Sequence, residues 1–365
     1  MQEGSFPGRP AHAIVARGDP SQMKALLLEE YKKLTVQDVP EPEIAPNEVL
    51  IRVKSCGICG SDVHGFDGSS GRRIPPVIMG HEASGVVAAL GSDVRDFREG
   101  DRVTFDSMIS CLRCYFCRQG RPNLCEDRRV LGVSCAEYRR HGAFAELVAV
   151  PQHIVFKVPE ALSFDEAAMV EPVSVAVHAV GITPVRMGDT AVVVGAGMIG
   201  LLTLQALRTA GCGKIVSVDL EDDRLAIAKK LGADEIINSR SADVPALIRE
   251  MTNGRGADIV MEAVGADPTV KMSIESVRKG GAVTLIGNVT PNVTLPLQSV
   301  VTREVTLYGS CASSNDYAAC LALMGRQAIQ VRPMISATVP LDRGAEMFDR
   351  LYKREPNLTK VILHP

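Results

Sequence analysis

From Ala191 onward the chain alternates short apolar strands with helical stretches, and this alternation limits its fold more than any other feature. Apolar strands are expected near residues 191, 215, 236, 258, 282 and 305, with helical patterns between them. Strands and helices that alternate in this way form a parallel sheet with helices on both faces. We therefore predict an α/β class with a doubly wound domain over residues 176–314.

A glycine-rich turn follows the first of these strands. Gly195-Ala-Gly197-Met-Ile199-Gly200 comes directly after an apolar strand and opens a helix. In this context the glycines permit a tight turn and let the backbone approach the pyrophosphate of a dinucleotide. A lone motif of this kind is often an ordinary strand-to-helix turn, but the strand–helix alternation argues against that alternative. We predict that Gly195, Gly197, Ile199 and Gly200 bind a dinucleotide cofactor.

The second strand of this region ends in a carboxylate. Asp219 lies nineteen residues after Gly200, where it would accept hydrogen bonds from the hydroxyls of an adenosine ribose. The same negative charge would repel a 2'-phosphate, so NAD is favoured over NADP. Arg224 would either stack on the adenine or, as a less favoured possibility, pair with a phosphate. The second possibility leaves NADP open as the alternative cofactor.

The first part of the chain has a different texture. Between Lys24 and about Pro159, short apolar alternations are separated by Gly, Pro and Asp turns, which indicates a compact, partly open barrel. Residues 315–365 return to a helix and short strands, and we expect them to join residues 23–175 in one domain. Residues 1–22 lack the apolar core of a signal peptide, so we expect a disordered extension or a remnant of cloning.

Four cysteines in this first part are spaced as ligands of one metal ion. Cys111, Cys114, Cys117 and Cys125 lie within fifteen residues in the pattern C-x2-C-x2-C-x7-C, which is typical of tetrahedral structural zinc. An iron–sulfur cluster is the alternative, but the proline usual after the fourth cysteine of a ferredoxin motif is absent. We predict a structural zinc ion.

A second group of metal ligands is incomplete. Cys59 and His81 offer one thiolate and one imidazole, and Glu82 and Glu171 are candidate carboxylates for a third position. A zinc ion with three protein ligands keeps a fourth position for water or substrate, and it lowers the pKa of a bound alcohol. We predict a catalytic zinc ion here. The spacing does not decide which glutamate coordinates it.

These residues also have ordinary structural interpretations. Cys56 and Cys59 fit a buried pair or a redox dithiol, His81 fits a hydrogen-bonded core histidine, and Glu82 fits an exposed loop carboxylate. The separate four-cysteine segment and the sequence Gly80-His81-Glu82 favour zinc. His178 lies in an apolar run, and we interpret it as a packed helix residue.

Composition excludes several classes of partner. The 365 residues carry a formal net charge of -3 with no long run of Lys or Arg, so neither nucleic acid nor an anionic membrane is expected. The apolar runs fall far short of the roughly 20 residues that a membrane span needs. Five of the ten cysteines have metal-site spacings, so we expect reduced thiols in the cytoplasm.

With these motifs the chain resembles the zinc-dependent medium-chain dehydrogenases from Met23 to Pro365. Residues 80–85 and 170–178 are similar to the sorbitol (polyol) and threonine dehydrogenase branch, in which a glutamate matched by Glu171 replaces a third zinc thiolate. The resemblance implies a GroES-like catalytic domain, a Rossmann domain, and a homodimer or homotetramer joined near residues 305–308. It also implies that the substrate proton passes to Ser61, through the ribose hydroxyls, and on to His64.

We therefore expect a zinc-dependent enzyme that transfers a hydride from a secondary alcohol of a polyol to NAD and releases a ketone. An L-threonine 3-dehydrogenase or a butanediol-type dehydrogenase is the alternative, and a non-catalytic NAD-sensing protein is a remote one. Animal sorbitol dehydrogenases carry Arg-Tyr near the nicotinamide where Ala312-Ser313 stands here. The resemblance therefore does not specify sorbitol itself.

Overall fold

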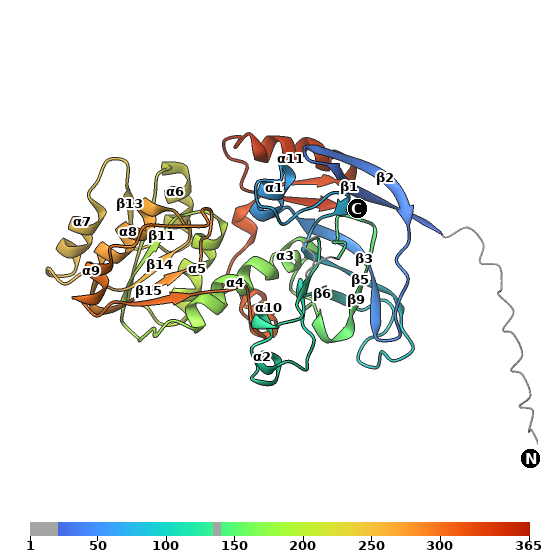
Figure 1. Cartoon of the computed structure of the whole chain (residues 1–365), viewed down its shortest axis with the longest axis horizontal. Helices are drawn as coiled ribbons and strands as arrows, with labels where there is room; N and C mark the ends of the chain where they lie inside the picture. Colours follow the sequence, from blue (N-terminus) through green and yellow to red (C-terminus); the bar gives the residue numbers. More distant parts are fainter. Residues whose placement is uncertain (1–20, 134–139) are drawn as a thin grey trace, which may run out of the picture.

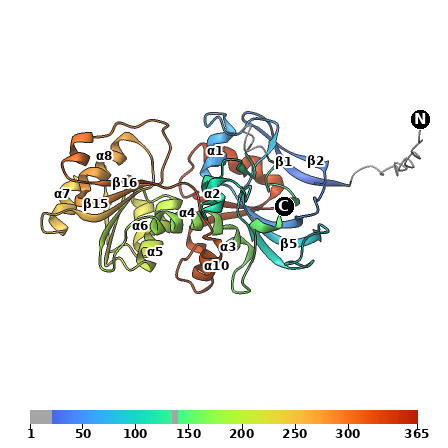
Figure 2. The ribbon, with the colours of Figure 1, turned by 60° about the horizontal axis from the view of Figure 1, so that its bottom comes forward.

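The computed structural model describes residues 21–133 and 140–365. They form a β-rich region and an α/β region, with helices α4 (Val170–Gly181) and α10 (Tyr317–Gly325) between the two (Figure 1, Figure 2). The expectation of a disordered extension falls on residues 1–20, which lie outside the described residues, while Gln22 already belongs to the first strand.

The α/β region is built on a six-stranded parallel sheet in the order β13-β12-β11-β14-β15-β16. This order is that of the dinucleotide-binding doubly wound fold, so the predicted fold class is confirmed. The observed strands cover the predicted positions, except that the last begins one residue later. They are β11 (Thr190–Val194), β12 (Lys214–Asp219), β13 (Glu235–Asn238), β14 (Ala257–Glu262), β15 (Val277–Leu285) and β16 (Thr306–Gly309).

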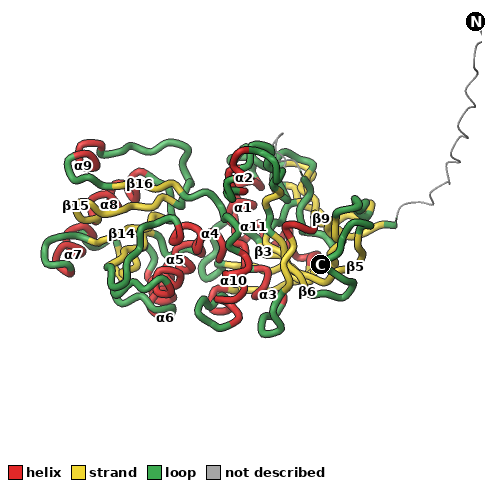
Figure 3. The backbone as a smooth tube through the Cα atoms, turned by 90° about the horizontal axis from the view of Figure 1, so that it is seen from below, coloured by secondary structure: helices red, strands yellow, loops and turns green. Residues whose placement is uncertain are grey.

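Helices cover both faces of this sheet (Figure 3). Successive side chains of a strand point to opposite faces. Accordingly, Val193 packs in the core cluster that includes α5, whereas Val192 and Val194 pack in the cluster that includes α7 and α8. Both faces are therefore apolar. The helices are α5 (Met198–Thr209), α6 (Asp222–Lys230), α7 (Val244–Met251), α8 (Asp267–Ser276) and α9 (Leu297–Val301).

The β-rich region contains a seven-stranded sheet in the order β10-β6-β5-β3-β18-β17, in which β9 also pairs with β3. A three-stranded sheet, β2-β1-β4, and the pair β7-β8 complete it. The strands are β1 (Gln22–Glu30), β2 (Lys33–Pro40), β3 (Glu48–Gly57), β4 (Val77–Ile78), β5 (Glu82–Leu90), β6 (Arg102–Phe105), β7 (Met108–Ile109), β8 (Arg129–Val130), β9 (Leu147–Pro151), β10 (Val155–Lys157), β17 (Ile335–Pro340) and β18 (Lys360–His364). Its helices are α1 (Gly60–Phe66), α2 (Tyr115–Arg118), α3 (Phe164–Ala168) and α11 (Gly344–Tyr352), with short 3-10 turns at Pro122–Leu124, Gln152–Ile154, Arg332–Met334 and Leu341–Arg343.

The end of the chain returns to the first part through strand pairing. Strand β18 pairs antiparallel with β3, with Ile362 opposite Gly57, and β3 in turn pairs with β5, with Gly57 opposite Glu82. Two strands from the first part of the chain and one from its end therefore meet at Gly57. This meeting point brings Lys360 of β18 beside Glu82.

Two further observations concern the whole chain. Helix α4 is continuous across residues 175 and 176, where we placed a domain boundary. Among residues 21–133 and 140–365, no helix combines the length and the apolar character that crossing a membrane requires.

Candidate active site

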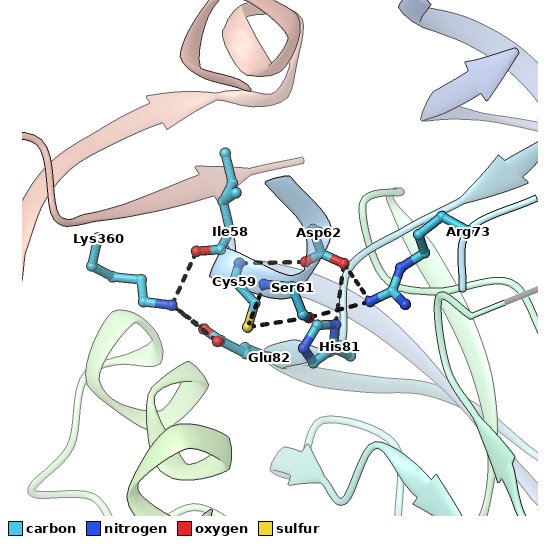
Figure 4. Close-up of polar contacts among 8 residues, drawn as sticks. All are labelled: Ile58, Cys59, Ser61, Asp62, Arg73, His81, Glu82 and Lys360. Carbon is cyan, nitrogen blue, oxygen red and sulfur yellow. Dashed lines mark hydrogen bonds and ion pairs between the residues drawn. The ribbon is translucent and has the colours of Figure 1, made fainter. Parts of the chain in front are cut away.

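Cys59 is placed by the junction of β3 and α1, where it is the N-cap residue of the helix. Its Sγ accepts a hydrogen bond from the backbone N–H of Ser61 at 3.4 Å, and the Ser61 hydroxyl donates to it at 3.4 Å. The Cys59 N–H donates to the carboxylate of Asp62 at 3.3 Å (Figure 4). These bonds fix the position of the Cys59 sulfur at the start of α1.

His81 and Glu82 approach Cys59 from the start of β5. The ligand atoms of these three residues all lie within 4.8 Å of one another. Gly80 makes the approach possible, because its φ is +92° and a Cβ there would lie 2.8 Å from the ring of Phe144. Among the described residues, the group that converges here consists of Cys59, His81 and Glu82. Glu171, at the start of α4, does not belong to it.

The charges around His81 fit a bound cation. Burial disfavours the charged imidazolium, but the neighbouring Asp62 and Cys59 outweigh burial and raise the pKa of His81. The negative charge that attracts a proton to this imidazole would equally attract a metal ion. One thiol, one imidazole and one carboxylate are also ligands that zinc accepts, so the donor set fits a zinc ion.

Lys360 neutralises Glu82. Its Nζ donates to the two carboxylate oxygens at 2.9 and 2.6 Å and to the backbone oxygen of Ile58 at 3.0 Å. The side chains of Lys360 and Glu82 are only 3% and 1% exposed. The interpretation of Glu82 as an exposed loop carboxylate is therefore wrong. Sequence reasoning missed Lys360, because nothing local to β18 indicates a site residue.

Asp62 and Arg73 form a second layer around the ligands. Asp62 Oδ1 lies 3.4 Å from His81 Nδ1 and 2.9 Å from Arg73 Nη2. A metal-binding histidine usually directs its other ring nitrogen to a carboxylate, which fixes the ring. Sequence reasoning missed this role. The signal that was available is the position of Asp62 three residues after Cys59.

Ser61 and His64 both lie on α1. Ser61 is exposed and its hydroxyl lies beside Cys59 Sγ, while His64 is exposed in the last turn of the helix. Within the described part of the chain, no hydrogen bond joins the two side chains. A relay between them therefore needs the cofactor hydroxyls that the resemblance invokes.

Glu171 has an unusual acidity. Burial, together with the charges of Glu82 and Asp106, raises its pKa to about 7, although His81 and Lys360 act in the opposite direction. A carboxyl group with this pKa exchanges protons readily near neutral pH.

The four cysteines of the second predicted site also come together. Their sulfur atoms lie within 4.8 Å of one another. The N–H of Cys111 donates to Cys125 Sγ at 3.2 Å, and the N–H of Cys114 donates to Cys111 Sγ at 3.4 Å. Backbone N–H groups of Cys117 and Glu126 lower the pKa of Cys114 to about 6. This cluster, residues 111–125, is called the cysteine lobe below, and its donors fit a tetrahedral zinc ion.

The glycine turn has space for a phosphate. Gly195 has φ +98°, and a Cβ on Gly200 would lie 1.7 Å from the Gly195 oxygen, so both positions require glycine. A Cβ on Gly197 would meet nothing within 4 Å, and Gly197 is the N-cap of α5 without a side-chain cap. Free helix N–H groups beside open space are an anion-binding arrangement. Ile199 lies half-buried in the first turn of α5.

Asp219 is tied to this turn. Its Oδ2 accepts the N–H of Ala196 at 2.6 Å, and its Oδ1 accepts the N–H groups of Leu220 and Glu221 at 2.8 and 3.0 Å. Arg224 Nη1 lies 3.9 Å from Asp219 Oδ2, and its side chain is half exposed. The carboxylate and the arginine thus lie side by side at the end of β12.

His178 has more contacts than a packed helix residue needs. Its Nδ1 lies 3.2 Å from Asp316 Oδ2, and its Nε2 lies 3.4 Å from Asn123 Nδ2. Asn123 also donates to the backbone oxygen of Cys311 at 2.9 Å. These contacts join the cysteine lobe to the segment between β16 and α10, which sequence reasoning did not foresee.

The comparisons with known proteins agree with this site. Residues 45–160 match the model of the alcohol dehydrogenase GroES-like domain, and residues 199–326 match that of the zinc-binding dehydrogenases. The sorbitol dehydrogenase of Bacillus subtilis (strain 168) is 34% identical over 350 residues, which cover 95% of this chain and 98% of the relative. The chain belongs to the zinc-dependent medium-chain dehydrogenases. It is therefore an oxidoreductase of the alcohol dehydrogenase type.

Two further relatives place this dehydrogenase more closely. The L-idonate 5-dehydrogenase of Vitis vinifera is 35% identical over 336 residues, covering 90% of this chain and 91% of the relative. A zinc-binding dehydrogenase from Sinorhizobium meliloti 1021, crystallised with NADP, superposes with a TM-score of 0.87 and 33% identity, covering 94% of this chain and all of that one. The predicted resemblance to the polyol branch is confirmed.

Proposed function

We propose that this dehydrogenase oxidises a secondary alcohol of a polyol to a ketone and transfers the hydride to NAD. One observation carries the proposal: among the described residues, a thiol, an imidazole and a carboxylate converge within 4.8 Å and offer three protein ligands. Three ligands leave a fourth position for substrate. The names of the sorbitol and L-idonate relatives support a polyhydroxylated substrate.

We assign Cys59, His81 and Glu82 as the ligands of a catalytic zinc ion, with Glu171 as the alternative carboxylate ligand. When bound, the zinc ion supplies a Lewis acid that lowers the pKa of the substrate hydroxyl. Ser61, whose hydroxyl lies beside Cys59, and the exposed His64 would accept the hydroxyl proton and release it to solvent, with the ribose hydroxyls of the cofactor between them. The cysteine lobe holds a second, structural zinc ion.

The decisive experiment removes one ligand. Cys59→Ala should lower turnover, because a catalytic metal ion contributes several kcal/mol and each 1.4 kcal/mol is about tenfold, giving a loss of at least roughly 1000-fold. The assay follows NADH absorbance with sugar alcohols, short diols and L-threonine, so it also tests the alternative substrates. Cys212→Ala, which removes a buried thiol outside the proposed zinc sites, serves as the control. Normal turnover by Cys59→Ala on a panel substrate would refute the proposal.

The cofactor preference has its own test. We propose that Asp219 binds the ribose diol and selects NAD, while Arg224 is the group that would favour NADP. Asp219→Ser should lower the NAD-to-NADP ratio of kcat/KM about 10- to 100-fold, the worth of a hydrogen bond to a charged group. The ratio is the right measurement, because Asp219 also holds the glycine turn and its loss lowers both rates. The exposed Asp223 of α6, changed to Ser, should leave the ratio unaltered.

The remaining assignments concern organisation. We propose that residues 23–175 and 315–365 form the catalytic domain and residues 176–314 the cofactor domain, which the pairing of β18 with β3 supports. We propose a homodimer or homotetramer joined at β16, the end strand of its sheet. We propose a cytoplasmic location, which the nine described cysteines support because all are free.

A further inference from the structure

Arg73 is a buried arginine that lies beside the proposed metal site without being one of its ligands. Its side chain is 3% exposed, and that of its partner Asp62 is 0% exposed. Its Nη2 lies 2.9 Å from Asp62 Oδ1 and donates to the Ser61 hydroxyl oxygen at 3.3 Å (Figure 4). One guanidinium nitrogen therefore contacts both the residue behind His81 and the residue beside Cys59.

The absence of a side chain at Gly65 leaves the space that the Arg73 side chain occupies. A Cβ on Gly65 would lie 2.1 Å from Arg73 Cγ and 3.0 Å from Arg73 Cβ. Gly65 lies in the last turn of α1 and is buried. Any other residue there would push the stem of Arg73 away, so the glycine allows the guanidinium to reach Asp62.

The charges explain why a cation is needed at this point. Asp62 Oδ1 is shared between Arg73 at 2.9 Å and His81 Nδ1 at 3.4 Å. A fully buried carboxylate without a compensating cation is strongly destabilising and moves to find another partner. Arg73 thus keeps Asp62 in place whether or not His81 carries a charge.

We propose that Arg73 is a positioning residue that controls how firmly the catalytic zinc is held and how the Ser61 hydroxyl is oriented. Through Asp62 it fixes the His81 ring, and partners of this kind change metal affinity or activity 10- to 100-fold. By donating to Ser61 Oγ, it occupies a lone pair and favours the orientation in which the hydroxyl proton points to Cys59 Sγ. This inference rests on the proposed function, which assigns Cys59 and His81 as ligands.

The test measures zinc release to a chromogenic chelator, which does not depend on turnover. Two release phases are expected from the wild type, and the phase missing from Cys59→Ala identifies the catalytic site. In Arg73→Met this phase should be about 10- to 100-fold faster, with Arg73→Lys between the two. With a sorbitol or butanediol substrate, kcat should fall while the KM for NAD stays constant, because Arg73 belongs to the β-rich region and the glycine turn to the α/β region.

A second variant displaces Arg73 without removing it. Gly65→Ala should also accelerate the catalytic phase, although alanine favours a helix more than glycine does. It provides the test if Arg73→Met fails to fold. The matched control is Arg140→Met, which removes a partly buried arginine paired with Glu48 in the same region and should leave zinc release unchanged.

The outcomes are distinguishable. Folded Arg73→Met and Gly65→Ala proteins that release zinc at the wild-type rate would overturn the role of Arg73 and leave the proposed function intact. A Cys59→Ala protein with the same zinc content as the wild type would instead overturn the catalytic zinc site itself. Faster release from both variants, with normal release from Arg140→Met, supports the positioning role.

Discussion

Asp106 is a carboxyl group that the protein holds in an unfavourable environment. Burial raises its pKa to about 7, and the neighbouring charge of Asp316 acts in the same direction, although the N–H of Met108 donates to it at 2.9 Å. Its folded pKa is thus above its unfolded value near 3.8. Between these two values the unfolded chain ionises first, so this group removes stability as the pH rises from about 4 to about 7.

Asp106→Asn should remove this dependence. The amide oxygen keeps the hydrogen bond from the N–H of Met108, and no proton is taken up on folding. At pH values above 7, the free energy of unfolding of the variant should therefore exceed that of the wild type by on the order of 1 to 2 kcal/mol. Below pH 4 the two proteins should be equally stable. Urea titrations at pH 4, 6 and 8 measure this, and parallel pH curves for the two proteins would contradict it.

The residues that sequence reasoning found are those with local spacing. Cys59, His81 and the four cysteines of the lobe follow known ligand patterns, and the structure brings the atoms of each set together. Lys360 lies 278 residues from Glu82, so no local pattern connects the two. Only the strand pairing at Gly57 reveals that pair. Sequence therefore indicates ligands better than it indicates the charges that surround them.

At the scale of elements, the cysteine lobe is attached to the segment between β16 and α10. Asn123 donates to the Cys311 oxygen at 2.9 Å, and the Gly120 oxygen accepts bonds from Ser314 and Asn315 at 3.4 and 3.2 Å. The lobe has little secondary structure, with only the four-residue α2 and one 3-10 turn. We therefore expect its shape to depend on the zinc ion that we propose its cysteines hold.

Removing a lobe ligand should loosen this segment. Cys114→Ser should lower the zinc content from about two ions per chain to about one, and it should speed amide exchange at residues 311–316 at least about tenfold. Hydrogen exchange with mass spectrometry measures the effect. Cys320→Ser, a buried cysteine outside the lobe, is the control for zinc content. Unchanged exchange at the segment in the zinc-depleted protein would show that the lobe does not hold it.

Elements were predicted more accurately than their junctions. The parallel strands followed from apolar runs with regular spacing, because the central strands β11, β12 and β14 are buried on both faces of the sheet. The sequence did not indicate that α4 would lie between the β-rich and α/β regions, because its apolar run resembles that of any core helix. His178 in that helix contacts Asp316 and Asn123, neighbours that only the fold brings together.

At the scale of the whole molecule, β16 is the end strand of its sheet, and exposed apolar side chains lie on the segments that precede it in the chain. Leu297 and Val301 of α9 are 63% and 64% exposed, and Val289 is 59% exposed. An unpaired edge strand beside apolar side chains is a surface suited to a second copy of the chain. This arrangement supports the proposed assembly.

Changing this surface should separate the subunits. Leu297→Asp combined with Val301→Asp places two charges where a partner would bury them, so the assembly should dissociate into monomers that keep their fold. Size-exclusion chromatography with light scattering measures the mass. Met187→Asp changes another exposed apolar residue, 91% exposed, and should leave the mass unaltered. A double variant that keeps the wild-type mass would place the interface elsewhere.

The pairing of β18 with β3 has a consequence for biosynthesis. Lys360 donates to the Ile58 oxygen across 302 residues, so the counter-charge of Glu82 is translated long after Cys59 and His81. Domains fold in the order in which they leave the ribosome. A nascent chain therefore exposes the side chains of Cys59 and His81 before Lys360 is synthesised, and the charge of Glu82 is balanced only after the α/β region has been translated.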